Sequence, residues 1–204
     1  MAITGDVGAG KSTVAKMFRS LGGFLIDADR VVAELWQTPE MTAAAVGRWG
    51  EAVLGESGHV RHQAIAERIF DDRVEYDWVT GLVHPRVMKE IERQIECQIE
   101  GRIQCPTETR RWGIVEIPLL FEAGVAPWVT VTAFVTASKE TRAARCRQRG
   151  WSEAEMTKRE SFFLPGKERM ERSDYVIHND GGLRELEEAV EEVYTKAIYP
   201  KGGL

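Results

Sequence analysis

The stretch that decides the fold is GDVGAGKS, residues 5–12. It matches the phosphate-binding pattern G-x-x-x-x-G-K-[S/T] at every fixed position. A short apolar run, residues 1–4, precedes it as a predicted buried strand, and residues 12–21 follow with the apolar spacing of a helix. Because the motif works only between a strand and a helix, this context predicts a nucleoside triphosphate site.

Each fixed position of this loop has a chemical reason. Glycines let backbone N–H groups crowd around phosphate oxygens, and the N-terminus of the following helix adds the positive end of its dipole. We expect Lys11 to reach the outer phosphates and Ser12 to ligate Mg²⁺. The candidate nucleotide-binding residues are therefore Gly8, Ala9, Gly10, Lys11, Ser12 and Thr13.

Strand-like and helical segments alternate in the outer parts of the chain. Further short strands are predicted at residues 24–26, 112–120, 129–135 and 175–178, and an amphipathic helix at 183–199. Residues 30–104 are mostly helical, and so are 139–170, with breaks near Gly150 and Pro165. This order favours an α/β fold with a parallel sheet flanked by helices.

Composition limits the class of protein. A hydrophobic content of 43% in 204 residues is ordinary for a globular chain, and a net charge of −5 argues against nucleic acid as the main partner. Apolar stretches fall well short of the roughly 20 residues that span a membrane, so we expect a cytoplasmic protein without a membrane partner. The three cysteines, Cys97, Cys105 and Cys146, form no CxxC pair and predict neither a disulfide framework nor a zinc site.

Two acids follow the second predicted strand. Asp27 and Asp29 stand where ligands bind in open parallel sheets, and alternate residues of an extended chain point the same way, so both could face the nucleotide. The alternative is that one or both cap a helix beginning near Arg30. Both roles can coexist.

Five blocks of sequence resemble the dephospho-CoA kinase family, in order and at appropriate spacing. The phosphate loop is shared with many enzymes, whereas the other blocks together are much more specific. They are residues 2–13, IDAD at 26–29, HP at 84–85, IPLLFE at 117–122 and SDYVIHN at 173–179.

The resemblance implies transfer of the γ-phosphoryl group of ATP to the 3′-hydroxyl of dephospho-CoA, with Mg²⁺ accompanying ATP and with Asp29 as the base. It implies one kinase domain of the P-loop NTPase type, in which the core comprises residues of about 1–30, 109–137 and 174–204. A helical CoA-binding subdomain would span about 31–108, and a helical lid about 138–173. The resemblance is compatible with a monomer or a small homo-oligomer.

Several side chains have two interpretations. Arg145 and Arg149 share one helix face and match basic positions of the family's lid, which would bind ATP, but a solvated helix face is the alternative. His84 would lie near the acceptor substrate, or would be a turn residue ahead of a helix that starts at Pro85. Glu122 would hold a water or substrate contact, or cap the segment after it.

Three positions depart from the family pattern. Glu116 stands where many members carry Asp, a change that would shift any water-mediated Mg²⁺ contact, unless it is an acid with a structural partner. Arg142 and Phe163 stand where glutamines are expected. We expect Arg142 and Phe163 to affect details of the lid and adenine contacts without changing the phosphate chemistry.

The rival hypotheses are a related nucleoside or nucleotide kinase and a nucleotide-binding module without turnover. The HP and IPLLFE blocks distinguish the dephospho-CoA kinase hypothesis from the first rival. A guanine-reading Asn-Lys-x-Asp segment, which a GTP-dependent switch needs, is not supplied by residues 178–180. Lys11, Ser12 and Asp29 all serve phosphoryl transfer, so their joint presence disfavours a module that only binds.

Overall fold

The computed structural model describes residues 1–103, 112–122 and 124–199. Its contacts divide the chain into two units. The sheet unit comprises Met1–Ile26 and Ile95–Leu204, and the helical unit comprises Asp27–Gln94. Cys105 lies outside the described residues. So do the end of the predicted CoA-binding subdomain (about 31–108) and the start of the predicted core segment (about 109–137). None of the described helices is long and apolar enough to cross a membrane.

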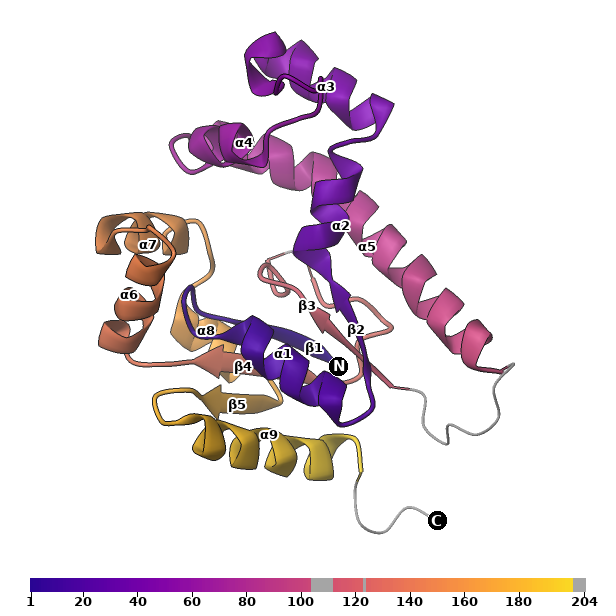
Figure 1. Cartoon of the computed structure of the whole chain (residues 1–204), viewed down its shortest axis with the longest axis vertical. Coiled ribbons are helices and arrows are strands. Elements are labelled where there is room, and N and C mark those ends of the chain that lie inside the picture. Colours follow the sequence, from indigo (N-terminus) through magenta and orange to yellow (C-terminus); the bar gives the residue numbers. More distant parts are fainter. Residues whose placement is uncertain (104–111, 123, 200–204) are drawn as a thin grey trace. The chain divides into compact units, whose positions relative to one another are not determined.

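Five strands form one sheet in the order β2-β3-β1-β4-β5, which confirms the predicted α/β class (Figure 1). Strand β1 pairs in parallel with β3 and β4, with Ala2 opposite Val115 and Gly5 opposite Val135, and β4 pairs in parallel with β5. The strands are β1 (Ala2–Gly5), β2 (Phe24–Asp27), β3 (Gly113–Glu116), β4 (Thr132–Thr136) and β5 (Tyr175–His178).

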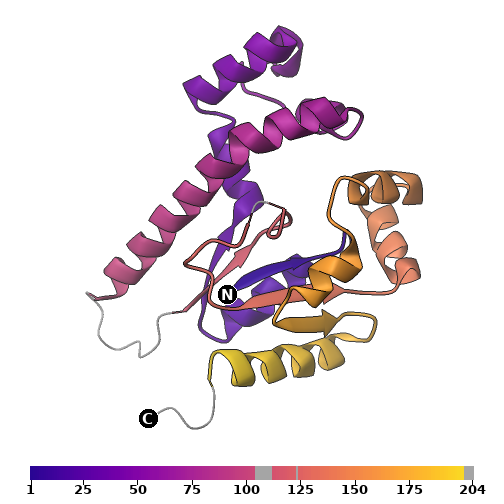
Figure 2. The ribbon, with the colours of Figure 1, turned by 180° about the vertical axis from the view of Figure 1, so that it is seen from behind.

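Helices cover both faces of the sheet. Helices α1 (Lys11–Ser20) and α9 (Leu183–Ala197) pack together on one face, over a core that includes Ile3, Val135 and Ile177. Side chains alternate between the faces of a strand, so Phe134 points to the opposite side. There it meets α8 (Gly166–Glu171), which lies across that face in the view from behind (Figure 2).

The remaining helices of the sheet unit are α6 (Lys139–Gln148) and α7 (Glu153–Glu160), which contact each other. The gaps after α6 and before α8 confirm the breaks predicted near Gly150 and Pro165. Ser138 and Ser152 cap the two helices by accepting hydrogen bonds from the N–H groups of Thr141 and Glu155. Cys146 is a free, buried cysteine that packs with Val7, Ala143 and Met156.

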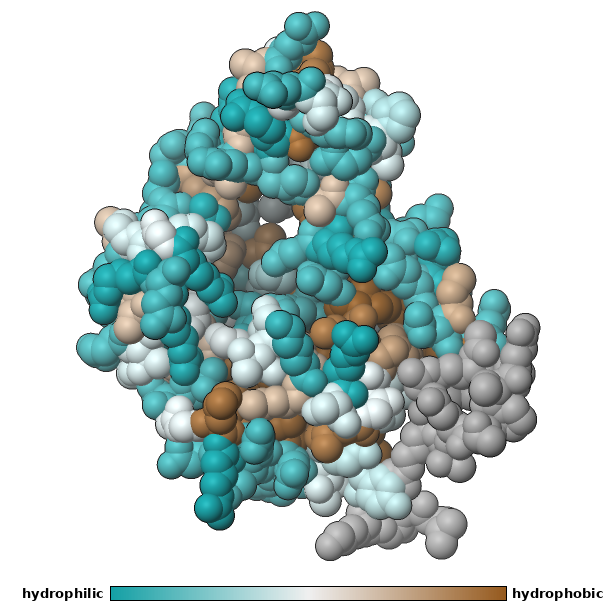
Figure 3. Space-filling view, in the orientation of Figure 1, coloured by the Kyte–Doolittle hydropathy of each residue, from teal (hydrophilic) through white to brown (hydrophobic). Residues whose placement is uncertain are grey.

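The helical unit has an aromatic core with arginines around it. Trp49 lies between Trp36 and Trp78, with ring centroids at 6.5 and 5.1 Å. Glu75 accepts hydrogen bonds from Trp49 and from Nε and Nη2 of Arg48, which ties α3 to α5. The elements are α2 (Ala28–Leu35), α3 (Pro39–Trp49), the 3-10 turn η1 (Glu51–Val53), α4 (His62–Ile69) and α5 (Arg73–Ile103). Hydrophilic side chains predominate on the visible face over α3 and α4 (Figure 3).

Two expectations about elements were wrong in detail. The strand predicted at 112–120 ends at Glu116, because the last ladder bond runs from the Ile117 N–H to the Ile3 carbonyl and Pro118 has no N–H to continue it. No helix starts at Pro85, since α5 runs from Arg73 through this proline. Its 31 residues supply enough other hydrogen bonds to tolerate the one that proline removes.

Candidate active site

The phosphate loop connects the end of β1 to the start of α1. Gly8 and Gly10 have φ angles of 77° and 94°, in the left-handed region that favours glycine. Space excludes side chains as well, because a Cβ atom on Gly10 would lie 2.3 Å from Asn179 Nδ2, and one on Gly8 would lie 2.8 Å from the Arg142 carbonyl oxygen. The motif glycines are therefore required by conformation and by packing.

The N-terminus of α1 is suited to an anion. Gly10 is the N-cap and supplies no side-chain hydrogen bond, and the first turn of this helix, which is fully described, contains no acidic residue. The N–H groups of Thr13 and Val14 bond to the Gly10 carbonyl. Because no carboxylate competes for the N–H groups at this helix end, the positive end of the helix dipole can bind a phosphate.

Lys11 and Ser12 lie at the start of this helix. The Lys11 ammonium donates to the carbonyl oxygens of Asp6 at 3.0 Å and Gly5 at 3.3 Å, so it rests against the loop's own backbone. The Ser12 hydroxyl donates to Glu116 Oε1 at 3.2 Å, at the carboxyl end of β3. Glu116 thus has a partner in the loop, and this acid and Ser12 form a pair of oxygen ligands next to the phosphate site.

This oxygen pair fits Mg²⁺ better than a transition metal. Hydroxyl and carboxylate oxygens are the ligands that Mg²⁺ prefers, and the ion usually keeps one or two protein ligands alongside phosphates and waters. No group of three or more His, Cys, Asp or Glu side chains is arranged for metal binding among the residues described. The residues present therefore suit a metal that arrives with a nucleotide.

Arg145 is bound to the loop, whereas Arg149 is exposed. Arg145 donates to the carbonyl oxygens of Ala9 at 3.2 Å and Asn179 at 2.9 Å. Arg149 is the C-cap residue directly after α6, and its guanidinium makes no hydrogen bond or ion pair to the residues described. The structure brings Arg145 together with the loop residues, and the role of Arg149 in binding ATP stays a prediction.

Asn179 is a site residue that the sequence did not single out. Its side-chain amide donates to the Ala9 carbonyl at 2.7 Å, and its backbone N–H donates to Thr136 at the end of β4. It is buried against Gly10. Its position at the end of the block 173–179 was the available signal, because a polar residue directly after a parallel strand lies at the ligand edge of the sheet.

Two of the departures from the family pattern, Arg142 and Phe163, lie within residues 138–173. Arg142 pairs with Glu160 and also donates to the carbonyl oxygens of Val7, at 3.3 Å, and Ala137, at 3.1 Å. Glu160 in turn accepts the Val7 N–H at 3.3 Å. The Phe163 ring centroid lies 5.5 Å from the Arg169 guanidinium. Both departures therefore have structural partners in the sheet unit.

Asp27 and Asp29 belong to the helical unit and have different surroundings. Asp27 caps α2, because its Oδ1 accepts the Arg30 N–H at 3.1 Å. Asp29 is exposed in the first turn of this helix, which begins at Ala28, close to the predicted start near Arg30. The expectation of two acids on an extended chain was wrong, since one is a cap and the other is helical.

His84 lies inside a helix, and Glu122 lies in the turn that follows β3. His84 lies inside α5, half-buried, so the interpretation as a turn residue ahead of a helix was wrong. Glu122 accepts the Leu164 N–H at 2.9 Å through Oε1, which ties it to the segment before α8. Its other oxygen is buried and has no hydrogen-bond partner among the described residues.

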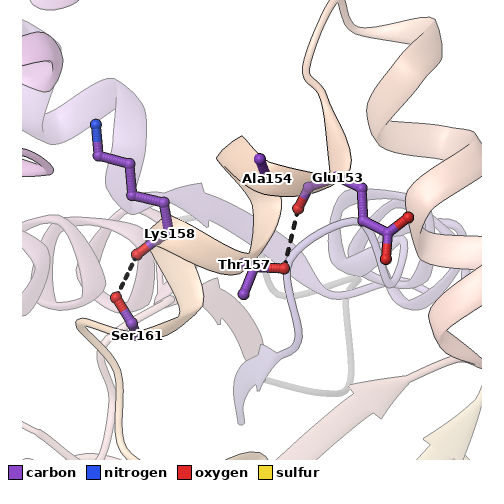
Figure 4. A pocket seen from close by; sticks show the side chains of 5 residues that line it. All are labelled: Glu153, Ala154, Thr157, Lys158 and Ser161. Carbon is purple, nitrogen blue, oxygen red and sulfur yellow. Dashed lines mark hydrogen bonds between the residues drawn. The ribbon is translucent and has the colours of Figure 1, made fainter.

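A hollow of about 550 Å³ on α7 is not a candidate site. It is lined by Glu153, Ala154, Thr157, Lys158 and Ser161, which all come from α7 and the residue after it (Figure 4). The Thr157 and Ser161 hydroxyls donate to the carbonyl oxygens of Glu153 and Lys158 within this helix. They are therefore committed to the backbone rather than directed at a ligand.

The comparisons with known proteins agree with this geometry. A family model described as dephospho-CoA kinase matches residues 1–185. A dephospho-CoA kinase of Aquifex aeolicus is 30% identical over 195 residues, with 95% of each chain covered. A crystal structure of a Thermus thermophilus protein has a TM-score of 0.73 at 30% identity, with 96% of each chain covered.

A dephospho-CoA kinase of Campylobacter jejuni, at 17% identity and a TM-score of 0.65 over 96% of this chain and 94% of that one, shares the fold. The family match covers the phosphate loop, the helical unit and the residues of α6 to α8. From the loop geometry and this match over residues 1–185 we conclude that the chain belongs to the dephospho-CoA kinase family.

Proposed function

We propose that this protein transfers the γ-phosphoryl group of ATP to the 3′-hydroxyl of dephospho-CoA, which gives CoA and ADP, the last step of CoA synthesis. The observation that carries the proposal is the phosphate loop, with its uncapped helix end and its Ser12–Glu116 pair, in a chain matched by the family over residues 1–185. A cytoplasmic location, where ATP is available, belongs to the same proposal.

In this mechanism the loop binds the triphosphate before any bond changes. The N–H groups at the start of α1 hold the phosphate oxygens, and Lys11 moves from the Gly5 and Asp6 carbonyls to the β- and γ-phosphates. Ser12 and Glu116 would hold Mg²⁺, which neutralises charge on the phosphates when bound. Arg145 and Arg149 would add positive charge from α6.

The chemical step then forms the bond between the 3′-oxygen and the γ-phosphorus and breaks the bond to the β,γ-bridging oxygen. Asp29 accepts the hydroxyl proton, and ADP leaves with the bridging oxygen. In this proposal the helical unit binds dephospho-CoA, with His84 near the acceptor. The segment 138–173 acts as a lid, which excludes water from the reaction.

The test is Mg²⁺-dependent ADP release from ATP with dephospho-CoA, AMP or pantetheine phosphate added separately, and identification of CoA as the product. Asp29→Asn should lower kcat by about 100-fold or more, because a positioned base contributes about that much. Asp27→Asn is the matched control, since Asn caps a helix as well as Asp does and the residue lies two positions away.

Turnover with AMP and not with dephospho-CoA would instead favour a related nucleotide kinase. ADP binding without turnover of any acceptor would favour a module that only binds. Equal losses in Asp27→Asn and Asp29→Asn would contradict the assignment of Asp29 as the base.

A further inference from the structure

Arg169 of α8 is a buried charge on the face of the sheet opposite α1. Only 2% of the residue is exposed. Its guanidinium donates to the Gly5 carbonyl and to Asp6 Oδ1, both at 3.1 Å, and to the Leu164 carbonyl at 3.0 Å. One arginine therefore connects α8 to the first two residues of the phosphate loop.

The pair formed by Asp6 and Arg169 is enclosed and satisfied. The rings of Phe134 and Phe163 lie 5.3 and 5.5 Å from the guanidinium, and Thr136 donates to Asp6 Oδ2 at 2.7 Å. Burying two charges has a large desolvation cost that their attraction seldom exceeds. Stability alone is thus a weak reason for an ion pair at this position.

The same two loop residues hold Lys11. The Gly5 carbonyl accepts from both Arg169 and Lys11, at 3.1 and 3.3 Å, and the Asp6 carbonyl accepts from Lys11 at 3.0 Å. The Asp6 side chain is held by Arg169 and Thr136 while its backbone carbonyl faces the lysine ammonium. The orientation of these two peptide groups is therefore fixed from behind the loop.

We propose that Arg169 and Asp6 form a positioning pair, which sets the first turn of the phosphate loop and thereby the place from which Lys11 reaches the phosphates. The identity of the nucleotide rests on the proposed function, whereas the effect on phosphate binding does not. Lysine cannot replace Arg169, because a single ammonium cannot reach the three acceptors that the planar fork bonds together.

The experiment compares Arg169→Lys, Asp6→Asn and the control Arg172→Lys. Arg172 lies on the same helix, and its partly exposed side chain pairs with Glu168 at 3.4 Å. We measure the Kd of ADP with Mg²⁺ by calorimetry, KM for ATP and for dephospho-CoA, and thermal unfolding. Arg169→Lys and Asp6→Asn should each raise the ADP Kd by about tenfold, whereas KM for dephospho-CoA stays within about twofold.

A folded Arg169→Lys protein that binds ADP as tightly as the wild type, with only a lower Tm, would overturn the proposal, since the pair would then serve stability alone. If Arg169→Lys does not fold, Asp6→Asn carries the same test, because asparagine keeps the shape and removes the charge. Wild-type protein that binds ADP but does not phosphorylate dephospho-CoA would refute the proposed function and leave this test valid.

Discussion

At the scale of single residues, Gly10 shows how conformation and packing act at the same position. Gly10 and Gly22 flank α1 with φ angles of 94° and 99°, but only Gly10 would bring a Cβ atom into contact, at 2.3 Å from Asn179. A Cβ atom on Gly22 would meet nothing within 4 Å. A comparison of substitutions at these two glycines therefore distinguishes the effect of backbone strain from the effect of a clash in the phosphate loop.

Alanine at each of these positions gives the first prediction. Both Gly10→Ala and Gly22→Ala should lower the free energy of unfolding by about 1–2 kcal/mol, because a left-handed backbone is unfavourable for an L-residue. Only Gly10→Ala should also abolish ADP binding, since Asn179 must move. Thermal unfolding and calorimetry with ADP and Mg²⁺ check this, and equal ADP affinities of the two variants would contradict it.

Glu116 gives a second prediction for a single residue. Because its carboxylate accepts from Ser12 at 3.2 Å, Glu116→Gln keeps a hydrogen-bonding group and loses the charge that we propose supports Mg²⁺. The Mg²⁺ concentration for half-maximal activity should rise by roughly tenfold, because loss of a supporting carboxylate typically weakens metal affinity by at least about that factor. Glu116→Asp, which keeps the carboxylate, is the control. A Mg²⁺ titration in which Gln and Asp variants behave alike would refute this role.

At the scale of elements, α5 carries an acid whose pKa is strongly lowered. Hydrogen bonds from Arg93 and Gln94 lower the pKa of Glu90 from 4.5 to about 2. A lowered folded-state pKa contributes stability above the unfolded value, and this contribution is lost as pH falls from about 4.5 towards 2. The side chain is 29% exposed, so solvent screening keeps the contribution below about 1 kcal/mol.

Glu90→Gln should therefore lower the free energy of unfolding at pH 6 by less than about 1 kcal/mol, and the difference from the wild type should vanish near pH 2. Urea unfolding between these pH values measures it. Glu92→Gln is the control, because Glu92 is exposed on the same helix and makes no hydrogen bond or ion pair to the residues described. If the difference in free energy of unfolding between Glu90→Gln and the wild type grew towards low pH, the prediction would be contradicted.

At the scale of the whole molecule, the phosphate loop connects segments that are distant in sequence. Ala9 is bonded by Arg145 and Asn179, which lie 136 and 170 residues further along the chain. A ligand that binds this arrangement, and not the unfolded chain, stabilises all of these segments together. Nucleotide binding should therefore be visible as global stabilisation.

ADP with Mg²⁺ at about 100 times its Kd should raise the free energy of unfolding by about 2.7 kcal/mol. Lys11→Met should lose this increase, because the variant lacks the ammonium that we propose reaches the phosphates. Lys167→Met is a matched control, since Lys167 is exposed and pairs only loosely with Glu171 at 3.8 Å. Thermal unfolding with and without ADP tests the prediction, and an increase that persists in Lys11→Met would exclude this site.

Features that are local in the chain could be predicted from the sequence alone. The loop at residues 5–12 needs a strand before it and a helix after it, and periodicity identified both, so the parallel α/β class followed. The capping role of Asp27 was open from the sequence and is now assigned, because a cap involves only the next three residues. The family resemblance rested on blocks of contiguous residues, and the comparisons confirm it.

The distant side chains that contact the loop could not be identified without the three-dimensional structure. Asp6 occupies a position that the motif leaves free, and Arg169 is one of many charged residues in a helical stretch, so no local pattern predicts that they pair across 163 residues. The same holds for Asn179 and Ala9. A parallel sheet brings together strand ends far apart in sequence, and its register and the packing of α8 against it set those contacts.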